Sequence, residues 1–129
     1  MMKIILNKPK KYKSTFNFKL IHTFEKRLSE SERIKEKYPD VIPIIIEKAD
    51  NSPIQDLDKH KYLMKKDATV GQLLYMIRKN INLSSEQAVF LFVDDLVPQL
   101  TLEIGKLYEK SADKDGFLYI SYAPENAFG

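Results

Sequence analysis

The protein has 129 residues, of which 43% are hydrophobic and 30% charged, and it contains no cysteine. These values are typical of one globular domain with a single core, and the lack of cysteine excludes disulfides, thiol nucleophiles and thiolate metal sites. No apolar run is long enough to span a membrane, and the run near Met1 is too short for a secretion signal, so we expect a cytoplasmic protein.

The net charge of +3 is distributed unevenly along the chain. Residues 1–27 contain eight basic residues and one acidic residue, whereas the remainder contains 13 basic and 17 acidic residues. A basic arm on a mildly acidic body suggests an anionic partner, either phospholipid or nucleic acid, but a solvated tail explains the pattern equally well. We interpret residues 1–15, which are rich in lysine and lack periodicity, as a flexible N-terminal extension.

Two helices are predicted before the first strand. A short one begins near Phe16. A clearer one follows Thr23, which can cap it, and ends at Tyr38 because Pro39 stops it. The second helix has a thin apolar stripe and is otherwise charged, so we expect it to lie on the surface. The segment 41–47 is mostly β-branched, and its continuous apolar pattern predicts a strand that is buried on both faces.

A turn leads from this strand to a second one at Lys61–Lys65, where flanking lysines are typical of an edge strand. The next helix begins at Thr69, which fits a capping box with Gln72. Its apolar stripe consists of Val70, Leu73, Leu74, Ile77 and Ile81. Tyr75 and Met76 are apolar but lie outside the stripe. Either they are buried under the N-terminal segment, or they flank an apolar groove beside the edge strand.

The remaining elements are a short helical turn at Ser84–Gln87, a strand at 89–93, a helix with apolar spacing from Leu100 to Tyr108, and a last strand at 117–122. The order β-β-α-β-α-β predicts an α+β fold of the ubiquitin-like β-grasp type, with a four-stranded mixed sheet on a central helix and two additional N-terminal helices. This domain covers residues 16–123, and residues 124–129 form a flexible C-terminal tail. The tail ends in Gly129, which has no Cβ to hinder attack on its carbonyl and therefore suits acyl transfer.

Eight segments match one known family in the same order along the chain: Phe24–Arg27, Lys37–Asp40, Ile42–Ala49, Asp56–Lys59, Lys61–Leu63, Thr69–Gln72, Ile77–Lys79 and Leu118–Ile120. On these segments, the chain from His22 to Gly129 resembles the autophagy-related protein eight family of ubiquitin-like modifiers. The resemblance is strongest to the GABA-receptor-associated-protein type. It covers nearly all of the chain after the basic arm.

The resemblance implies a modifier that is not itself an enzyme and needs no cofactor. Its C-terminal glycine, here Gly129, is expected to be joined to phosphatidylethanolamine, and Phe128 fits the aromatic residue that usually precedes it. The implied partners are activating and conjugating enzymes, which carry the chain as a thioester, and a cysteine protease that processes or delipidates it. The expected location is the cytoplasm and, after lipidation, the autophagosome or a related vesicle. Nucleic acid is not an expected partner.

The resemblance also implies binding of short peptides from cargo receptors and adaptors, which carry an aromatic residue, two spacers and an aliphatic residue. The peptide is expected to add a strand to the free sheet edge, with its two side chains in separate pockets. The residues matching the pocket for the aromatic side chain, here called the aromatic set, are Glu30, Ile34, Pro43, Ile45, Lys61, Leu63 and Phe117. Those matching the pocket for the aliphatic side chain, the aliphatic set, are Tyr62, Met64, Ala68, Leu73, Met76 and Ile77. The expected contacts to acidic ligand residues are Arg27, Lys59 and Lys61.

Five positions depart from the family pattern. Lys65 stands where proline is common, Ala68 where leucine is usual and Leu73 where phenylalanine is usual, so we expect a wider pocket for the aliphatic side chain. Val41 and Asn80 replace arginines, which removes charge that can contact acidic ligands. The basic extension has no counterpart in typical members. We leave three alternatives open for this extension: that it is disordered, that it contacts anionic lipid, or that it folds over the groove.

Three other functions are kept as alternatives. Intrinsic catalysis is disfavoured, because the two histidines, His22 and His60, lack a metal-like or triad-like setting and the acid pairs fit turns and caps better than a catalytic dyad. A basic-arm module that binds an anionic membrane or nucleic acid would use the lysines and interleaved aromatic residues of the arm. A ubiquitin-like modifier or adaptor that is not attached to lipid is the third.

Overall fold

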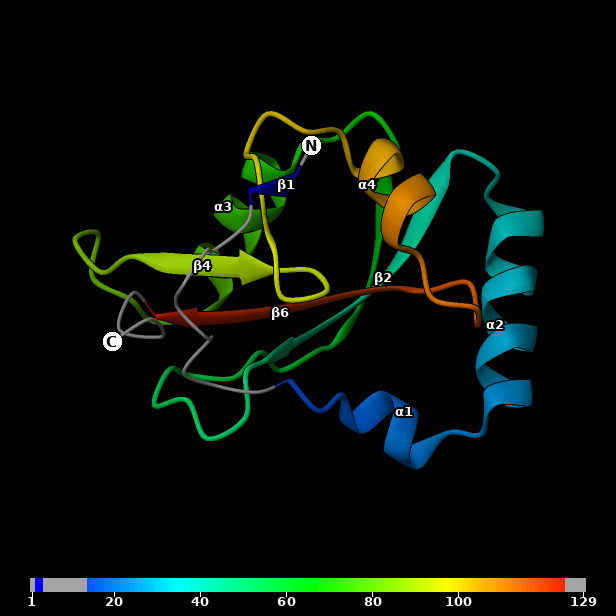
Figure 1. Cartoon of the computed structure of the whole chain (residues 1–129), viewed down its shortest axis with the longest axis horizontal. Coiled ribbons are helices and arrows are strands. Elements are labelled where there is room, and N and C mark those ends of the chain that lie inside the picture. Colours follow the sequence, from blue (N-terminus) through cyan, green and yellow to red (C-terminus); the bar gives the residue numbers. More distant parts are fainter. Residues whose placement is uncertain (1, 4–13, 125–129) are drawn as a thin grey trace.

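The computed structural model describes residues 2–3 and 14–124 (Figure 1). In chain order its elements are β1 (Met2–Lys3), α1 (Asn17–Ile21), α2 (Phe24–Lys37), β2 (Val41–Lys48), β3 (Lys61–Lys65), α3 (Val70–Asn80), β4 (Val89–Phe92), β5 (Val97–Pro98), α4 (Ile104–Ser111) and β6 (Leu118–Pro124). Among the helices of this part, none has the length and apolarity that crossing a bilayer requires.

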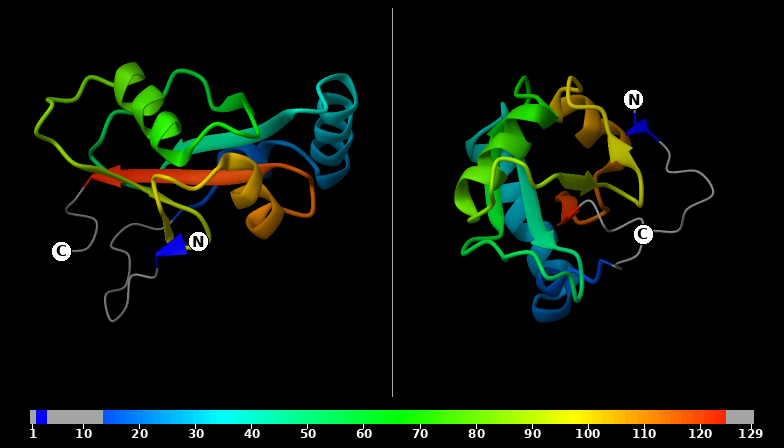
Figure 2. Two further views of the ribbon diagram at one scale, coloured as in Figure 1. Left: turned by 90° about the horizontal axis from the view of Figure 1, so that it is seen from above. Right: turned by 90° about the vertical axis from the view of Figure 1, so that its left-hand side faces the viewer.

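The main sheet has four strands in the order β3-β2-β6-β4. β2 and β6 run parallel at its centre, while β3 and β4 are antiparallel at its edges. α3 packs across one face of the sheet, and α1 and α2 lie at the end where β6 begins (Figures 1 and 2). A mixed four-stranded sheet on a central helix, with two additional N-terminal helices, confirms the predicted β-grasp. The edge position predicted for Lys61–Lys65 is also confirmed.

The burial of β2 on both faces is confirmed, since residues 42–47 are all buried. Ile42, Ile44 and Ile46 belong to the core beneath α3. Ile45 points to the opposite face, where it packs in a second cluster with Phe117. Successive side chains of a strand alternate between the two faces, so a strand covered on both sides needs a continuous apolar run. β2 therefore joins the α3 core to the cluster that includes Phe117.

α3 begins with the predicted capping box. The hydroxyl of Thr69 accepts from the Gln72 N–H at 3.2 Å, and the Gln72 side chain accepts from the Thr69 N–H at 2.8 Å. The predicted stripe faces the sheet, with four members buried and Leu74 half-buried. Outside the stripe, Tyr75 is 68% exposed, which contradicts for this residue the alternative of burial under the N-terminal segment. Met76 is half-buried and packs against the core.

Three local predictions need correction, and one strand was not predicted. Ser84 begins a hydrogen-bonded turn rather than a helical turn, and β5 is a strand that the sequence pattern does not indicate, because two residues carry no periodic signal. α4 begins only at Ile104, which leaves Leu100 outside the helix and 55% exposed. β6 continues to Pro124, the first residue of the predicted tail.

The N-terminal fifteen residues are described only in part. β1 pairs antiparallel with β5. Ser14 donates from its hydroxyl to the Ser121 hydroxyl at 2.7 Å, and the Thr15 N–H donates to the Asp50 carboxylate at 3.1 Å. Residues 1, 4–13 and 125–129 lie outside the described part. The flexible extension over 1–15 and the flexible tail over 124–129 therefore stay predictions.

Candidate functional site at the free edge of the sheet

The edge strand β3 pairs with β2 on one side. The Ile46 N–H donates to the His60 carbonyl at 2.8 Å, which fixes the hydrogen-bonded register of the two strands. Because antiparallel strands alternate between bonded and non-bonded pairs, the backbone groups of Lys61 and Leu63 point away from β2. Pro43, which has no N–H, lies opposite Leu63, where no ladder bond is needed. The edge therefore presents the donors and acceptors that an added strand requires.

The structure brings the aromatic set together from three elements and one loop. Glu30 and Ile34 come from α2, Pro43 and Ile45 from β2, Lys61 and Leu63 from β3, and Phe117 directly precedes β6. Ile34 packs against the cluster that contains Ile45 and Phe117. Glu30 and Lys61 form an ion pair that joins α2 to β3. Leu63 lies on the same strand as Lys61, two residues further along, and is 47% exposed. The set therefore combines a buried apolar wall with an exposed apolar residue.

The aliphatic set lies between β3 and the side of α3. Leu73 and Ile77 are fully buried, so their side chains can form only the floor of a site. The other four members, Tyr62, Met64, Ala68 and Met76, are half-buried and pack against the core. Burial is the main cause that raises the pKa of Tyr62, and the negative charges of Asp58 and Asp56 raise it further. The Tyr62 hydroxyl donates to the Lys59 carbonyl at 2.8 Å.

Of the three predicted contacts to acidic ligands, the structure separates Arg27 from the two lysines. Lys59 and Lys61 are exposed at or beside the edge strand. The Arg27 side chain is 11% exposed, and its Nε donates to the buried carboxylate of Asp115 at 2.8 Å. This hydrogen bond raises the pKa of Arg27. The sequence reasoning missed the role of Asp115, because 88 residues separate it from Arg27 and no local pattern links them.

Both histidines take part in local structure. The Nδ1 atom of His60 lies 2.9 Å from the carbonyl of Ile46, and the His22 ring packs on Phe18 with centroids 4.7 Å apart. Across residues 2–3 and 14–124, no three histidine, aspartate or glutamate side chains are grouped so that they could hold a metal ion. The predicted conjugation residue, Gly129, lies outside the described residues.

Comparison with known proteins places this geometry in a family. A family model described as "Autophagy protein Atg8 ubiquitin like" matches residues 26–129. The chain belongs to the Atg8 family. Autophagy-related protein 8 from Mycosarcoma maydis is 54% identical over 112 residues, which cover 87% of this chain and 95% of that relative. Autophagy-related protein 8e from Arabidopsis thaliana is 53% identical over 112 residues, covering 87% and 92%.

Solved Atg8 structures share the fold of this chain. The crystal structure of Trypanosoma brucei ATG8 superposes with a TM-score of 0.83 at 40% identity, covering 90% of this chain and all of that one. Plasmodium falciparum Atg8, solved in complex with a Plasmodium falciparum Atg3 peptide, gives a TM-score of 0.77 at 32% identity and covers 85% and 99%. These matches show that the protein is a ubiquitin-like autophagy protein of the Atg8 family.

Proposed function

We propose that this Atg8-family protein is conjugated through Gly129 to phosphatidylethanolamine on autophagosomal membranes and there binds peptides of cargo receptors and adaptors. The observation that carries the docking half is the free edge of β3, where Lys61 and Leu63 direct their backbone groups away from β2. Family membership supports the conjugation half. The protein supplies the acyl group, and its partners supply the catalytic cysteines.

Docking would proceed by addition of the peptide as a further strand on β3. Main-chain hydrogen bonds would provide affinity, and the two side-chain sites would provide specificity. The aromatic side chain would enter between α2 and β3, against Ile34 and the half-exposed Leu63. The aliphatic side chain would lie on the buried floor of Leu73 and Ile77. Acidic residues of the peptide would meet Lys59 and Lys61.

The aliphatic site should accept a larger side chain than is usual for the family. Ala68 and Leu73 replace leucine and phenylalanine at positions that border this site. Leu73 is fully buried, so its smaller side chain lowers the floor, whereas Ala68 is half-buried and removes part of a wall. Peptides that carry phenylalanine at the aliphatic position are therefore expected to bind at least as tightly as those that carry valine.

For conjugation, the proposed partners are an activating enzyme, a conjugating enzyme and a processing or delipidating cysteine protease. The complex of the Plasmodium relative with an Atg3 peptide supports an Atg3-type conjugating partner. The proposed location is the cytoplasm, with a membrane-bound form on autophagosomes. The test is reconstitution of the chain with these enzymes and liposomes that contain phosphatidylethanolamine. Intact mass should increase by the mass of one phosphatidylethanolamine less one water, because the Gly129 carboxyl and the lipid amine condense to an amide.

Replacing Gly129, the residue whose carbonyl is transferred to the lipid amine, provides the control for conjugation. Gly129→Ala should abolish the lipid adduct. Equal conjugation of this variant, or a product joined to protein lysines instead of lipid, would contradict the proposal. The second outcome would favour the modifier that is not attached to lipid.

Docking is tested by titrating a synthetic peptide that carries an acidic flank, tryptophan, two spacers and leucine. Leu63→Asp should weaken binding about tenfold or more, because it places a carboxylate in an apolar contact next to the acidic peptide. Leu20→Asp, at an exposed leucine on α1, is the matched control and should leave affinity unchanged. Equal effects of the two changes would argue against docking at β3.

A further inference from the structure

Polar contacts hold α2 against the turn before β6. The only buried residue of this helix is a serine, Ser31. Arg27, Ser31 and Lys35 are spaced four residues apart, so they lie on one face of the helix. The Ser31 hydroxyl donates to the Asp115 carbonyl at 2.5 Å, and the Lys35 ammonium donates to the Tyr108 hydroxyl at 2.6 Å. The position of α2 therefore depends on hydrogen bonds more than on apolar burial.

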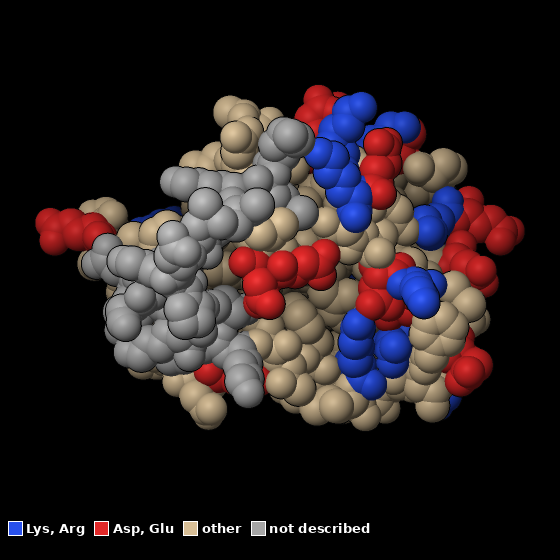
Figure 3. All heavy atoms as spheres, viewed as in Figure 1, with Lys and Arg blue, Asp and Glu red and all other residues tan. Residues whose placement is uncertain are grey.

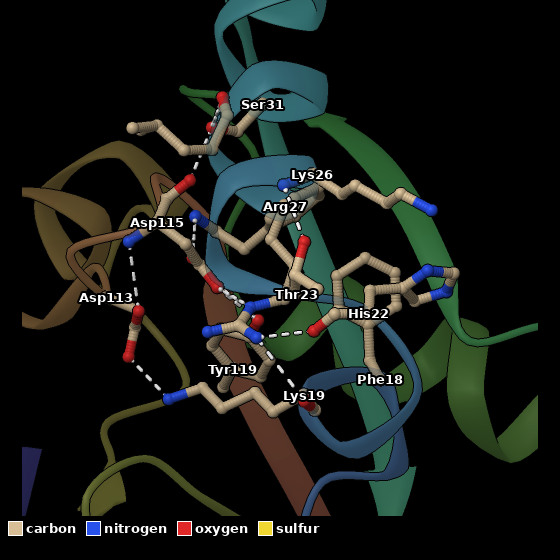
Figure 4. Close-up of polar contacts among 12 residues, drawn as sticks. Phe18, Lys19, His22, Thr23, Lys26, Arg27, Ser31, Asp113, Asp115 and Tyr119 are labelled. Carbon is tan, nitrogen blue, oxygen red and sulfur yellow. Dashed lines mark hydrogen bonds and ion pairs between the residues drawn. The ribbon is translucent and has the colours of Figure 1, made fainter.

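Asp115 is the centre of these contacts (Figure 4). Its side chain is fully buried and accepts three hydrogen bonds: from Arg27 Nε at 2.8 Å, from the Tyr119 hydroxyl at 2.5 Å and from the Phe117 N–H at 2.9 Å. A buried carboxylate is tolerated only when it is paired and hydrogen-bonded. These donors come from α2, from β6 and from the turn itself, so Asp115 fixes three segments relative to one another.

The same arginine also holds α1. Arg27 donates from its terminal nitrogen to the carbonyls of His22 at 2.7 Å and Lys19 at 3.3 Å, at the C-terminal end of that helix. The Lys19 ammonium lies 2.5 Å from the carboxylate of Asp113, in the same turn as Asp115. Basic and acidic side chains are closely mixed over α2, α4 and the turn that follows α4 (Figure 3). Both N-terminal helices are thus attached to this turn by charged groups.

Gly116 shows how closely α2 approaches the turn. This glycine has a φ of +89°, and a Cβ at its position would lie 2.3 Å from the Ser31 hydroxyl oxygen. A residue with a side chain would therefore clash with α2 and also be strained in its backbone. The close approach of α2 to the turn therefore requires glycine at position 116.

The consequence for the peptide site follows from where these contacts lie. α2 carries Glu30 and Ile34, and Phe117 follows Asp115 by two residues. Asp115 therefore determines the position of α2 through Arg27 and the position of Phe117 through a backbone hydrogen bond. Ile34 packs against the cluster to which Phe117 belongs, so the same carboxylate fixes two walls of the aromatic set.

We infer that Asp115 and Arg27 are positioning residues that set the spacing between α2 and Phe117 and thereby the affinity for the aromatic side chain of the peptide. They act without touching the ligand. This inference rests on the proposed function in that it concerns the same docking site. It adds a determinant of specificity that lies on the far side of α2 from β3.

The test is a double-mutant cycle between Arg27→Gln and the peptide. Three synthetic peptides are titrated: one with tryptophan and leucine, one with alanine in place of tryptophan, and one with alanine in place of leucine. Arg27→Gln should weaken the first and third peptides by about tenfold and the second by less than twofold, since coupling energies between interacting groups lie in this range. Lys26→Gln, an exposed neighbour on α2, should change none of them.

Two further variants keep the inference testable if Arg27→Gln destabilises the fold. Ser31→Ala removes one hydroxyl and should show the same selectivity at smaller amplitude, and Arg27→Lys should restore part of the affinity. Equal weakening of all three peptides by these variants would overturn the inference, because it would indicate a general loss of structure. Unchanged affinity in a folded Arg27→Gln protein would overturn it as well.

A measurement without peptide separates this inference from the proposed function. Nuclear Overhauser contacts between the Ile34 methyl groups and the Phe117 ring report the spacing directly. They should weaken in Arg27→Gln and persist in Lys26→Gln; persistence in both would overturn the inference. If the original protein binds none of the three peptides, it is the proposed docking function that fails, and the methyl-to-ring contacts still decide the role of Arg27.

Discussion

Glu30 of α2 and Lys61 of β3 form an ion pair that bridges the helix and the edge strand. The Lys61 side chain is 47% exposed and the Glu30 side chain is 22% exposed, so water and ligands can compete for this contact. An acidic peptide that adds to β3 would approach Lys61, and it would do so against the charge of Glu30. The Glu30 carboxylate and an acidic residue of the peptide would thus compete for the Lys61 ammonium.

Removal of the competing carboxylate should favour acidic ligands. Glu30→Gln is expected to tighten binding of a peptide with an acidic flank by about two- to fivefold, the range of partly exposed ion pairs, because Lys61 becomes available. A peptide with a neutral flank should bind equally to both proteins. Titration at low and at high salt checks the result. A gain that is independent of salt and of the flank would contradict an electrostatic cause.

Loss of the buried carboxylate should destabilise the whole domain. Asp115→Ala leaves the Arg27 guanidinium without its buried partner and removes the acceptor of the Tyr119 hydroxyl. Breaking one side of a buried ion pair costs about 3–5 kcal/mol of unfolding free energy. Lys114→Ala, at the exposed neighbouring residue, should stay within about 0.5 kcal/mol of the original protein. Urea denaturation measures both, and a loss below about 1 kcal/mol for Asp115→Ala would show that the pair is dispensable.

Two glycines should differ in how much stability the domain loses when each is replaced by alanine. Gly116→Ala introduces a Cβ 2.3 Å from the Ser31 hydroxyl oxygen at a positive φ and should cost about 2 kcal/mol or more. Gly71 lies in α3, where the nearest atom to an added Cβ is the Leu100 carbonyl oxygen at 3.2 Å. Gly71→Ala should therefore be nearly neutral, because the gain in helix propensity offsets a tight contact. Combining Gly116→Ala with Ser31→Gly should recover part of the loss, which thermal denaturation can measure.

Two buried tyrosines should make the domain less stable at alkaline pH. Burial raises the pKa of Tyr119 and of Tyr122 above the ordinary range, and hydrogen bonding to Asp115 and the charge of Asp56, respectively, raise them further. The folded state therefore retains these protons where the unfolded state, with pKa values near 10, releases them. Below pH of about 10 this contribution to stability is complete, and above it the contribution is lost as pH rises.

The expected decrease in unfolding free energy is about 1.4 kcal/mol per pH unit for each tyrosine. Urea denaturation between pH 9 and 11 measures this slope. Tyr122→Phe should be less stable at neutral pH, because the hydroxyl that donates to the Gln55 carbonyl at 2.8 Å is lost, but its slope should be smaller. Equal slopes for the two proteins would show that Tyr122 ionises normally in the fold.

The sequence predicts the elements whose causes are local. The capping hydroxyls of Thr23 and Thr69 and the apolar run of β2 mark their own boundaries, so the β-grasp follows from pattern alone. The aromatic and aliphatic sets were obtained from the family resemblance, and the structure places their members next to one another. The partnership of Arg27 with Asp115 has no local signal, because it forms only when α2 docks on the turn before β6. A two-residue strand such as β5 also gives no signal in the sequence, because two residues show no periodicity.

The fixed register of β2 with β3 has a consequence for peptide binding. A shift of β3 by a single residue would turn Tyr62 and Met64, which pack against the core, to the opposite face of the sheet, so the alignment of β2 with β3 has no neighbouring alternative. The free edge of β3 is consequently pre-organised, and an incoming peptide need not reorder the strand to which it binds. The packing of Tyr62 and Met64 against the core thus lowers the entropic cost of binding a peptide at this edge.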